Sequence, residues 1–423
     1  MNSADHQLIK RDRSLHGLAV LMNPQPLLEA MSGHSETEDI SLIKPDYIRY
    51  KPHANCIARF QIVNGGETGS AYAKVTAEDA QAKFEKVRAR LASHPLTADR
   101  VHYYPQWRLM FAMFPADAKL SSLARLLEPE TVGTLSQRIF KHQKPWHTTG
   151  IEILNYKPER RLVAKFNAGD GRSAVVKFYS GKGFERIRHT RKHLVAPQGI
   201  LTPGWIGGSK SHRAVALNWL EGDTLRDAAI PEDEKHVLAG QVAAHFHNSP
   251  QKRLKPLKAS LQAAALEGIA QQFTWLLPEL SDSVHSLLPD LVGLVMEDDG
   301  QRVPLHGDYY DKQVVVGADR PALIDCDQAR MGNPLEDLGC YLAHLERHNT
   351  RLAQAADTAH RDALLEGYQS VRPGLDDRQL DLWTAVALFR LLHHPFRDRD
   401  PNWPSRTRTL LDRCFQLAHG RHA

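Results

Sequence analysis

Carboxylates gather around two short apolar runs in the stretch VPLHGDYYDKQVVVGADRPALIDCDQARMGNPLEDLG. His306-Gly307-Asp308 precedes the run QVVV, and Asp325 and Asp327 follow the run ALI. Because ADRP between the runs is turn-like, we expect a β-hairpin whose ends bring these acids together. Carboxylates held so close are costly unless a cation lies between them. A hard cation such as Mg²⁺ relieves that cost and leaves one acid free as a base.

This spacing meets the requirements of phosphoryl transfer from ATP. One aspartate must orient the attacking hydroxyl and accept its proton, while an amide oxygen and a second aspartate hold Mg²⁺ against the phosphates. Gln313 lies five residues after Asp308 and supplies the amide oxygen, and Asp325 supplies the second carboxylate. The pattern predicts an ATP- and Mg²⁺-dependent phosphotransferase.

The same stretch resembles the catalytic core of the aminoglycoside phosphotransferase and choline kinase superfamily, which are small-molecule kinases with a protein-kinase-like fold. The resemblance covers residues 150–420 in plan, and its specific motifs lie within 305–339. It implies that Asp308 is the catalytic base, that Gln313 and Asp325 are Mg²⁺ ligands, and that Asp337 supports the catalytic loop.

The resemblance also implies a nucleotide site in the lobe before the catalytic stretch. SAVVKFY places Lys177 near the end of a strand, where the family holds the ATP phosphates with a lysine. ALNWLEGDTL resembles the family's hinge. Adenine is therefore expected to pair with the main chain of Asn218, Trp219, Leu220 and Glu221.

Three departures from the family pattern favour an alternative, a pseudokinase or nucleotide-binding scaffold on the same fold. Gln313 replaces asparagine and is one methylene longer. No GxGxxG loop precedes Lys177, so YKPERR must turn over the phosphates. Glu185 is the candidate to brace Lys177, although it follows by only eight residues. Lys165 and Lys74 compete with Lys177 for its role.

Each of several other polar residues has both a structural and a functional interpretation. Asp327 is either a secondary metal ligand or a loop acid, and His306 is expected to be a structural hydrogen-bonding residue. His344 and His348 have the i, i+4 spacing of zinc ligands, yet a solvated helix face is favoured. The basic run KGFERIRHTRKH is typical of a solvated helix, with attraction of phosphate as the alternative.

The elements that must position these residues include a duplication. The stretch Tyr47–Val75 matches Glu152–Phe178: each has a strand ending in Tyr-Lys-Pro, a second strand, a glycine-containing turn and a third strand with a lysine near its end. A helix and two more strands follow in each copy. The pattern predicts two β-rich lobes, at 41–130 and 146–222, with a loosely ordered lead-in over 1–40.

From residue 223 the apolar period changes to that of helices, so residues 223–423 are expected to form a helical lobe around the catalytic hairpin. The fold class predicted is α+β: a two-lobed protein-kinase-like fold preceded by an additional β-rich lobe that resembles a duplicated N-lobe. The first lobe is expected to be a cap or substrate-side wall, with a nucleotide lobe as the alternative. Helices are expected at 231–249, 257–280, 282–296, 335–347, 351–368, 378–393 and 403–419.

Bulk properties exclude several classes of protein. The formal charge of +5 is mild, and it favours anionic small molecules at least as much as nucleic acid or a membrane surface. Four dispersed cysteines without a CxxC pair argue against a zinc ribbon or a disulfide framework. No signal peptide or apolar run of about 20 residues is visible, so a cytoplasmic location is expected.

The expected partner is a small-molecule acceptor of the sugar or amino-alcohol type. Because LHHPFRDRDPNWPSR is basic, a neutral or anionic acceptor is favoured over a polycationic antibiotic.

Overall fold

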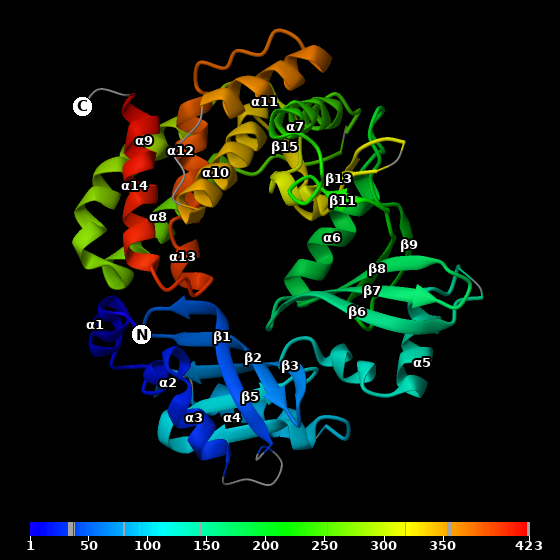
Figure 1. Cartoon of the computed structure of the whole chain (residues 1–423), viewed down its shortest axis with the longest axis vertical. Coiled ribbons are helices and arrows are strands. Elements are labelled where there is room, and N and C mark those ends of the chain that lie inside the picture. Colours follow the sequence, from blue (N-terminus) through cyan, green and yellow to red (C-terminus); the bar gives the residue numbers. More distant parts are fainter. Residues whose placement is uncertain are drawn as a thin grey trace.

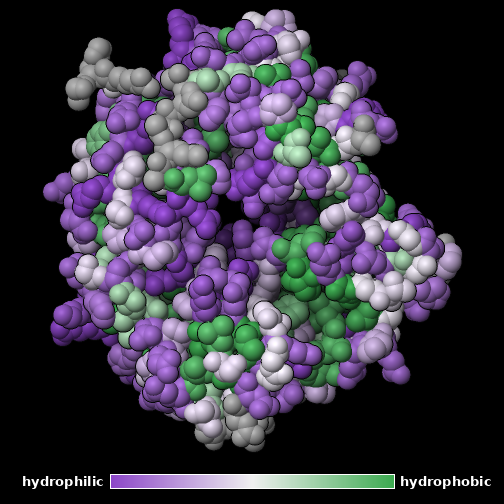
Figure 2. Space-filling model, viewed as in Figure 1, coloured by the Kyte–Doolittle hydropathy of each residue, from purple (hydrophilic) through white to green (hydrophobic). Residues whose placement is uncertain are grey.

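The computed structural model describes the chain except residues 33–36, 38, 79–80, 93, 144, 252, 318, 353–357 and 421–423. Two β-rich lobes and one helical lobe form a ring (Figure 1). Figure 2 shows a hollow at the centre of this ring, bordered mainly by hydrophilic residues. The three lobes therefore face a common polar space.

The first lobe is a five-stranded antiparallel sheet in the order β1-β2-β3-β5-β4. Its elements are β1 (Ile40–Lys51), β2 (Asn55–Asn64), β3 (Glu67–Thr76), α4 (Gln81–Ala92), β4 (Val101–Tyr104) and β5 (Leu109–Met113). Phe84 and Leu91 of α4 are buried with Tyr72 and Met110 on one face of the sheet. The other face belongs to a core that continues into the helical lobe.

The second lobe repeats this topology, with strand order β6-β7-β8-β10-β9. Its elements are β6 (Thr148–Lys157), β7 (Arg161–Ala168), β8 (Ser173–Tyr179), α6 (Gly181–His193), β9 (Trp205–Ser209) and β10 (Ala214–Asn218). The shared strand order, with a helix after the third strand of each, confirms the predicted fold class. One helix was not foreseen: α5 (Pro129–Ile139) buries Leu135 and Ile139 against the second sheet.

The helical lobe follows the apolar period of the sequence. Its helices are α7 (Glu232–His247), α8 (Ala259–Leu276), α9 (Ser281–Glu297), α10 (Pro334–Leu352), α11 (Thr358–Val371), α12 (Leu380–Leu391), α13 (His394–Arg397) and α14 (Trp403–His419). Six of the seven predicted helices agree to within five residues at each end, and the helix predicted at 351–368 corresponds to α11, whose described residues begin at Thr358. Among the described residues, no helix combines the length and apolar character that membrane crossing requires.

A small set of strands positions the catalytic stretch inside this lobe. β13 (Val314–Val316) and β14 (Ala322–Leu323) form the predicted antiparallel hairpin, with Val314 opposite Leu323. β11 (Asp223–Thr224) adds to its edge directly after the connection from the second lobe. β12 (Val303–Leu305), which is buried, pairs with β15 (Arg330–Gly332), so a further strand pair joins the segments on the two sides of the hairpin.

The lead-in differs from the loosely ordered segment expected at 1–40. Its helices are α1 (Ser3–Arg11), α2 (Leu18–Met22) and α3 (Gln25–Met31). Asn2 caps α1 in a reciprocal capping box with Asp5, and Asp5 forms an ion pair with Arg399 at 3.0 Å. These helices are too short to show a clear apolar period, and tertiary packing of side chains such as Leu8 stabilises them instead.

Candidate active site

An ion pair joins the second lobe to the catalytic hairpin. Lys177, in β8, places Nζ 2.6 Å from Oδ1 of Asp325 and 3.0 Å from Oδ1 of Asp327. Its side chain is only 5% exposed. The lysine predicted to hold phosphates therefore points at the predicted metal ligand, whereas most surface lysines are free in solvent.

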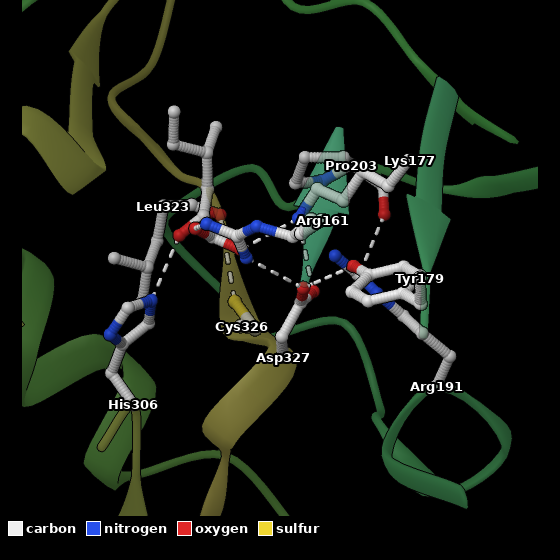
Figure 3. A network of polar contacts seen from close by, with 11 residues as sticks. Arg161, Lys177, Tyr179, Arg191, Pro203, His306, Leu323, Cys326 and Asp327 are labelled. Atoms are coloured by element: carbon white, nitrogen blue, oxygen red, sulfur yellow. Dashed lines mark hydrogen bonds and ion pairs between the residues drawn. The ribbon is translucent and has the colours of Figure 1, made fainter. Parts of the chain in front are cut away.

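Arg161 is a second cation at this site, and the sequence did not single it out. Its Nη1 lies 3.2 Å from Asp325 Oδ1 and its Nη2 3.3 Å from Asp325 Oδ2, while Nη1 also lies 3.3 Å from Asp327. The Tyr179 hydroxyl donates to Asp327. Figure 3 shows Arg161 and Tyr179 reaching Asp327 from the second lobe.

Strand register explains why Arg161 and Tyr179 belong to the site. Arg161 lies opposite Tyr179, and Tyr179 is two residues beyond Lys177 on the same face of β8. Counting back through the predicted hairpin from Lys177 would have identified both residues. The signal was present, but it required the pairing register of the two strands.

The surrounding cations keep Asp325 ionised. Burial opposes ionisation, but Lys177 and Arg161 outweigh it and hold the pKa of Asp325 well below its usual range. The residue has φ 58°, in the left-handed region that non-glycine residues rarely occupy. Such backbone strain is common where a side chain must be aimed at a ligand.

Asp337 holds the loop that carries Asp308. Its carboxylate accepts hydrogen bonds from the amides of His306 at 2.6 Å and Gly307 at 2.9 Å, and it lies 3.2 Å from Nε2 of His247. Gly307 has φ 81°, and an added Cβ would lie 2.6 Å from the Gln328 carbonyl oxygen. The loop therefore needs glycine at position 307. The two hydrogen bonds that Asp337 accepts are consistent with the loop-supporting role that the resemblance implied for it.

His306 is a structural residue of the same loop. It is buried, with Nε2 2.8 Å from the carbonyl oxygen of Ile324 and Nδ1 3.3 Å from the amide of Asp308. The ring donates to the Ile324 carbonyl oxygen and accepts from the Asp308 amide, so it bridges the two sides of the hairpin.

Asp308 and Asp325 line one cavity of about 320 Å³, together with Asp327. Burial, reinforced by the charge of Asp325, raises the pKa of Asp308 above its usual value. A carboxylate with a raised pKa is a stronger base than a solvated one. The structure thus brings together the two aspartates that the sequence placed on either side of the hairpin.

Gln313 is close to this site through its main chain. Its carbonyl oxygen accepts from the amide of Ile324 at 2.8 Å, so it is level with the residue before Asp325. The residue is buried, and it is not among the described residues that line the cavity.

The remaining cavity wall is basic. Lys157 is the last residue of β6, Arg160 lies in the turn between β6 and β7, and Arg186 comes from α6. Burial, together with Arg161 and Arg397, lowers the pKa of Lys157 to about 8. Arg186 belongs to the basic run that the sequence assigned to a solvated face, so at least one member of that run faces the site. Among the described residues that line the cavity, four basic side chains outnumber three acidic ones. This excess of positive charge suits a polyanionic ligand.

The segment after β10 offers free main-chain groups. The amide of Asn218 donates to Gly204 at 3.0 Å, and the amide of Trp219 donates to Ser173 at 3.3 Å. In the part of the chain that the structure describes, Leu220 and Glu221 have no main-chain partner. Of the four predicted hinge residues, these two retain unused donors and acceptors.

Two sequence interpretations need correction. Glu185 does not brace Lys177, because its carboxylate pairs with Arg188 at 3.0 Å and its side chain is 64% exposed. His344 does not lie on a solvated face: its ring stacks on Tyr310 with a centroid separation of 4.3 Å, and burial lowers its pKa to about 3. Side-chain ligand atoms of Asp308, Cys340 and His344 lie within 4.8 Å of one another, which places His344 beside the candidate base.

Comparisons with known proteins agree with this geometry. A family model described as "Phosphotransferase enzyme family" matches residues 161–409. The chain is similar to an apo structure of a thermostable mutant of aminoglycoside phosphotransferase APH(4)-Ia, with 18% identity, a TM-score of 0.50, and 67% of this chain and 99% of that chain covered. It is also similar to a mutant of that enzyme in a ternary complex with ADP and hygromycin B, with 18% identity, a TM-score of 0.51, and coverage of 69% and 100%. A search of curated proteins gave no match. At such identity the likeness concerns the fold, and the family match leaves the first lobe outside it.

Proposed function

The chain belongs to the phosphotransferase enzyme family, and we propose that it is an ATP- and Mg²⁺-dependent kinase. The acceptor is a hydroxyl of a small molecule of the sugar or amino-alcohol type. The observation that carries the proposal is the shared cavity of Asp308 and Asp325, with Lys177 paired to Asp325 at its edge.

Asp308 is the base in this proposal. It orients the acceptor hydroxyl and accepts its proton as the oxygen attacks the terminal phosphorus of ATP, and ADP leaves. The raised pKa of Asp308 supports this role, as does the loop geometry fixed by Asp337. The Asp308 carboxylate carries the proton until the product departs.

The donor set suits magnesium. Asp325 and Asp327 both line the cavity and offer carboxylate oxygens of the kind that a hard cation prefers. Gln313, whose main chain bonds that of Ile324 beside Asp325, is the proposed amide-oxygen ligand. When bound, Mg²⁺ would neutralise charge that develops on the phosphates. Asp325 is kept ionised by Lys177 and Arg161, so it is ready to act as a ligand at neutral pH.

Lys177 and Arg161 are the proposed phosphate-binding residues. Both are fixed on adjacent strands: Arg161 lines the cavity, and Lys177 is held against Asp325, which also lines it. Little side-chain entropy therefore remains to be lost on binding. On binding, a negatively charged nucleotide phosphate would replace part of the ion pairing that Lys177 and Arg161 now have with the two aspartates. The free main-chain groups of Leu220 and Glu221 are the proposed partners of adenine, with Asn218 and Trp219 shaping the hinge.

Positive charge near Asp308 favours a neutral or anionic acceptor, because His344, which lies beside Asp308, has its pKa lowered by burial and by the charges of Arg347 and Arg397. Arg347 and Arg397 share the single carboxylate of Asp398, and Arg397 also contacts His394 at 2.7 Å. Two guanidinium groups on one carboxylate leave a net positive charge. A polycationic acceptor would be repelled by it.

The test is nucleotide consumption with a panel of sugars, amino alcohols and aminoglycosides, with and without Mg²⁺. The proposal predicts metal-dependent turnover with a neutral or anionic alcohol. Turnover of aminoglycosides alone would overturn the acceptor class. The alternative, a pseudokinase or nucleotide-binding scaffold, predicts binding without turnover or metal dependence, and the departure from asparagine at Gln313 is the feature that favours it.

A further inference from the structure

The turn between β6 and β7 is buried in the first lobe. Glu159, at the tip of this turn, is 1% exposed, and its carboxylate lies 2.8 Å from Nζ of both Lys74 and Lys119. Arg49 lies 3.9 Å away. Burial opposes ionisation of Glu159, but Lys74 and Lys119 outweigh it and lower the pKa of the carboxyl. A buried carboxylate needs such partners, so the socket is specific for a negative charge.

Asp117, from the end of the first lobe, holds the main chain of the same turn. Its Oδ2 accepts from the Tyr156 hydroxyl and from the Glu159 amide, each at 2.8 Å. Its Oδ1 accepts from the amides of Lys119 and Leu120 at 2.7 and 2.9 Å. One buried carboxylate thus fastens the turn to the segment that follows the first sheet.

Two arginines of the first sheet complete the socket. Arg59 donates to the carbonyl oxygen of Tyr156 and is itself held by Asp46 at 2.8 Å. Arg49 donates to the carbonyl oxygen of Pro158 at 3.5 Å. The first lobe therefore binds both the side chain of Glu159 and the main chain around the turn.

The first lobe and the lead-in helix α1 are anchored to the helical lobe on the other side. In α1, Asp5 pairs with Arg399, and Arg11 donates to the carbonyl oxygen of Trp275 at 2.9 Å. Apolar residues of the first sheet share one core with the helices. The socket for Glu159 is thus fixed relative to the lobe that carries Asp308, as the closed ring of Figure 1 illustrates.

The seated turn and the strand ends beside it carry three of the cations that line the cavity. Lys157 is the last residue of β6, Arg160 belongs to the turn, and Arg161 is the first residue of β7. We propose that the first lobe is a positioning device. By seating Glu159 it holds the turn over the cavity and presents Lys157, Arg160 and Arg161 to the nucleotide phosphates. This inference rests on the proposed kinase function for the identity of the ligand.

The duplicated sheets support this role through corresponding lysines. Lys74 of β3 lies opposite Met110, the second residue of β5, and Lys177 of β8 lies opposite Val215, the second residue of β10. Lys177 binds Asp325, and Lys74 binds Glu159 of the neighbouring lobe. The same position in each sheet thus holds a carboxylate from the adjoining part of the chain. In the first lobe that carboxylate orders the turn, which lacks the glycines of a flexible phosphate loop.

The test compares Lys74→Met and Glu159→Gln with the conservative Lys74→Arg, and with Lys86→Met, which removes an exposed lysine on α4. Amide hydrogen exchange measures residues 156–161, with the β7–β8 turn as an internal reference. Steady-state kinetics measures KM separately for nucleotide and acceptor. Thermal unfolding of each variant checks that it is folded.

We expect faster exchange at 156–161 and a rise of about tenfold in nucleotide KM for Lys74→Met and Glu159→Gln, because small displacements of charged groups weaken phosphate contacts. Acceptor KM should change by less than about twofold. Lys74→Arg should retain most of the wild-type affinity, and Lys86→Met all of it. Unchanged exchange or unchanged nucleotide KM in folded Lys74→Met would overturn the inference while leaving the proposed function intact. A wild-type protein that binds no nucleotide would overturn both.

Discussion

Lys177 Nζ lies 2.6 Å from Oδ1 of Asp325, and this contact joins the second β-rich lobe to the catalytic hairpin. Arg161 and Asp327 complete a cluster of two cations and two carboxylates. The charges balance within a largely buried site, so removing one member leaves an uncompensated partner. If the proposed function holds, the cluster links nucleotide binding to the stability of the interface between the lobes.

Lys177→Met is expected to lower kcat/KM for nucleotide by about 100-fold or more, because a fixed phosphate-binding charge is lost. It should also lower the free energy of unfolding by about 3 kcal/mol, the order of cost for breaking a buried pair. Lys210→Met, an exposed lysine of the same lobe, is the control. Kinetics and denaturant unfolding measure both effects. A Lys177→Met protein with wild-type nucleotide KM would contradict the assignment.

The pH profile of kcat/KM should have two limbs. Activity should fall at acid pH as Asp308 becomes protonated, at a pH above the ordinary aspartate range because its pKa is raised. It should fall again above about pH 8, where Lys157 loses its positive charge. Lys157→Arg keeps the charge at all these pH values and should move the basic limb upward. A basic limb that stays in place in Lys157→Arg would exclude Lys157 as its origin.

Asp337→Asn should slow catalysis with little effect on nucleotide binding. The amide nitrogen of asparagine cannot accept from the His306 or Gly307 amides, so one loop amide loses its partner and Asp308 loses its fixed position. We expect kcat to fall by about 100-fold, with nucleotide KM changed by less than about threefold. Asp376→Asn, which alters an exposed carboxylate, is the control. Equal losses in kcat for both variants would argue against loop support.

Magnesium dependence tests the proposed ligands. Gln313→Ala should raise the half-saturating Mg²⁺ concentration by about tenfold, whereas Gln313→Asn retains an amide oxygen and should remain closer to the wild type. Asp325→Asn should abolish metal-dependent turnover, because it removes the ionised ligand. A Mg²⁺ titration of activity gives each value. Identical half-saturation in Gln313→Ala and the wild type would remove Gln313 from the ligand set.

The sequence predicted features that depend on local pattern. The carboxylates on either side of the hairpin, the position of Lys177 and the duplicated sheets all follow from strand alternation and motif spacing. The role of Arg161 could not be predicted in this way, because that role depends on which residue of β7 lies opposite Tyr179 in β8. Glu185 was misjudged because spacing along a helix does not reveal which way its side chain points. The socket for Glu159 is a contact between residues 85 positions apart, so only the tertiary structure reveals it.

Asp308→Asn gives the most direct test of the kinase assignment, with phosphoryl transfer and nucleotide affinity measured on the same folded protein. We expect transfer to fall by about 1,000-fold or more, since asparagine cannot accept the hydroxyl proton. Nucleotide affinity should remain within about threefold of wild type. Retained transfer, or loss of nucleotide binding together with transfer, would contradict the role of Asp308 as the base.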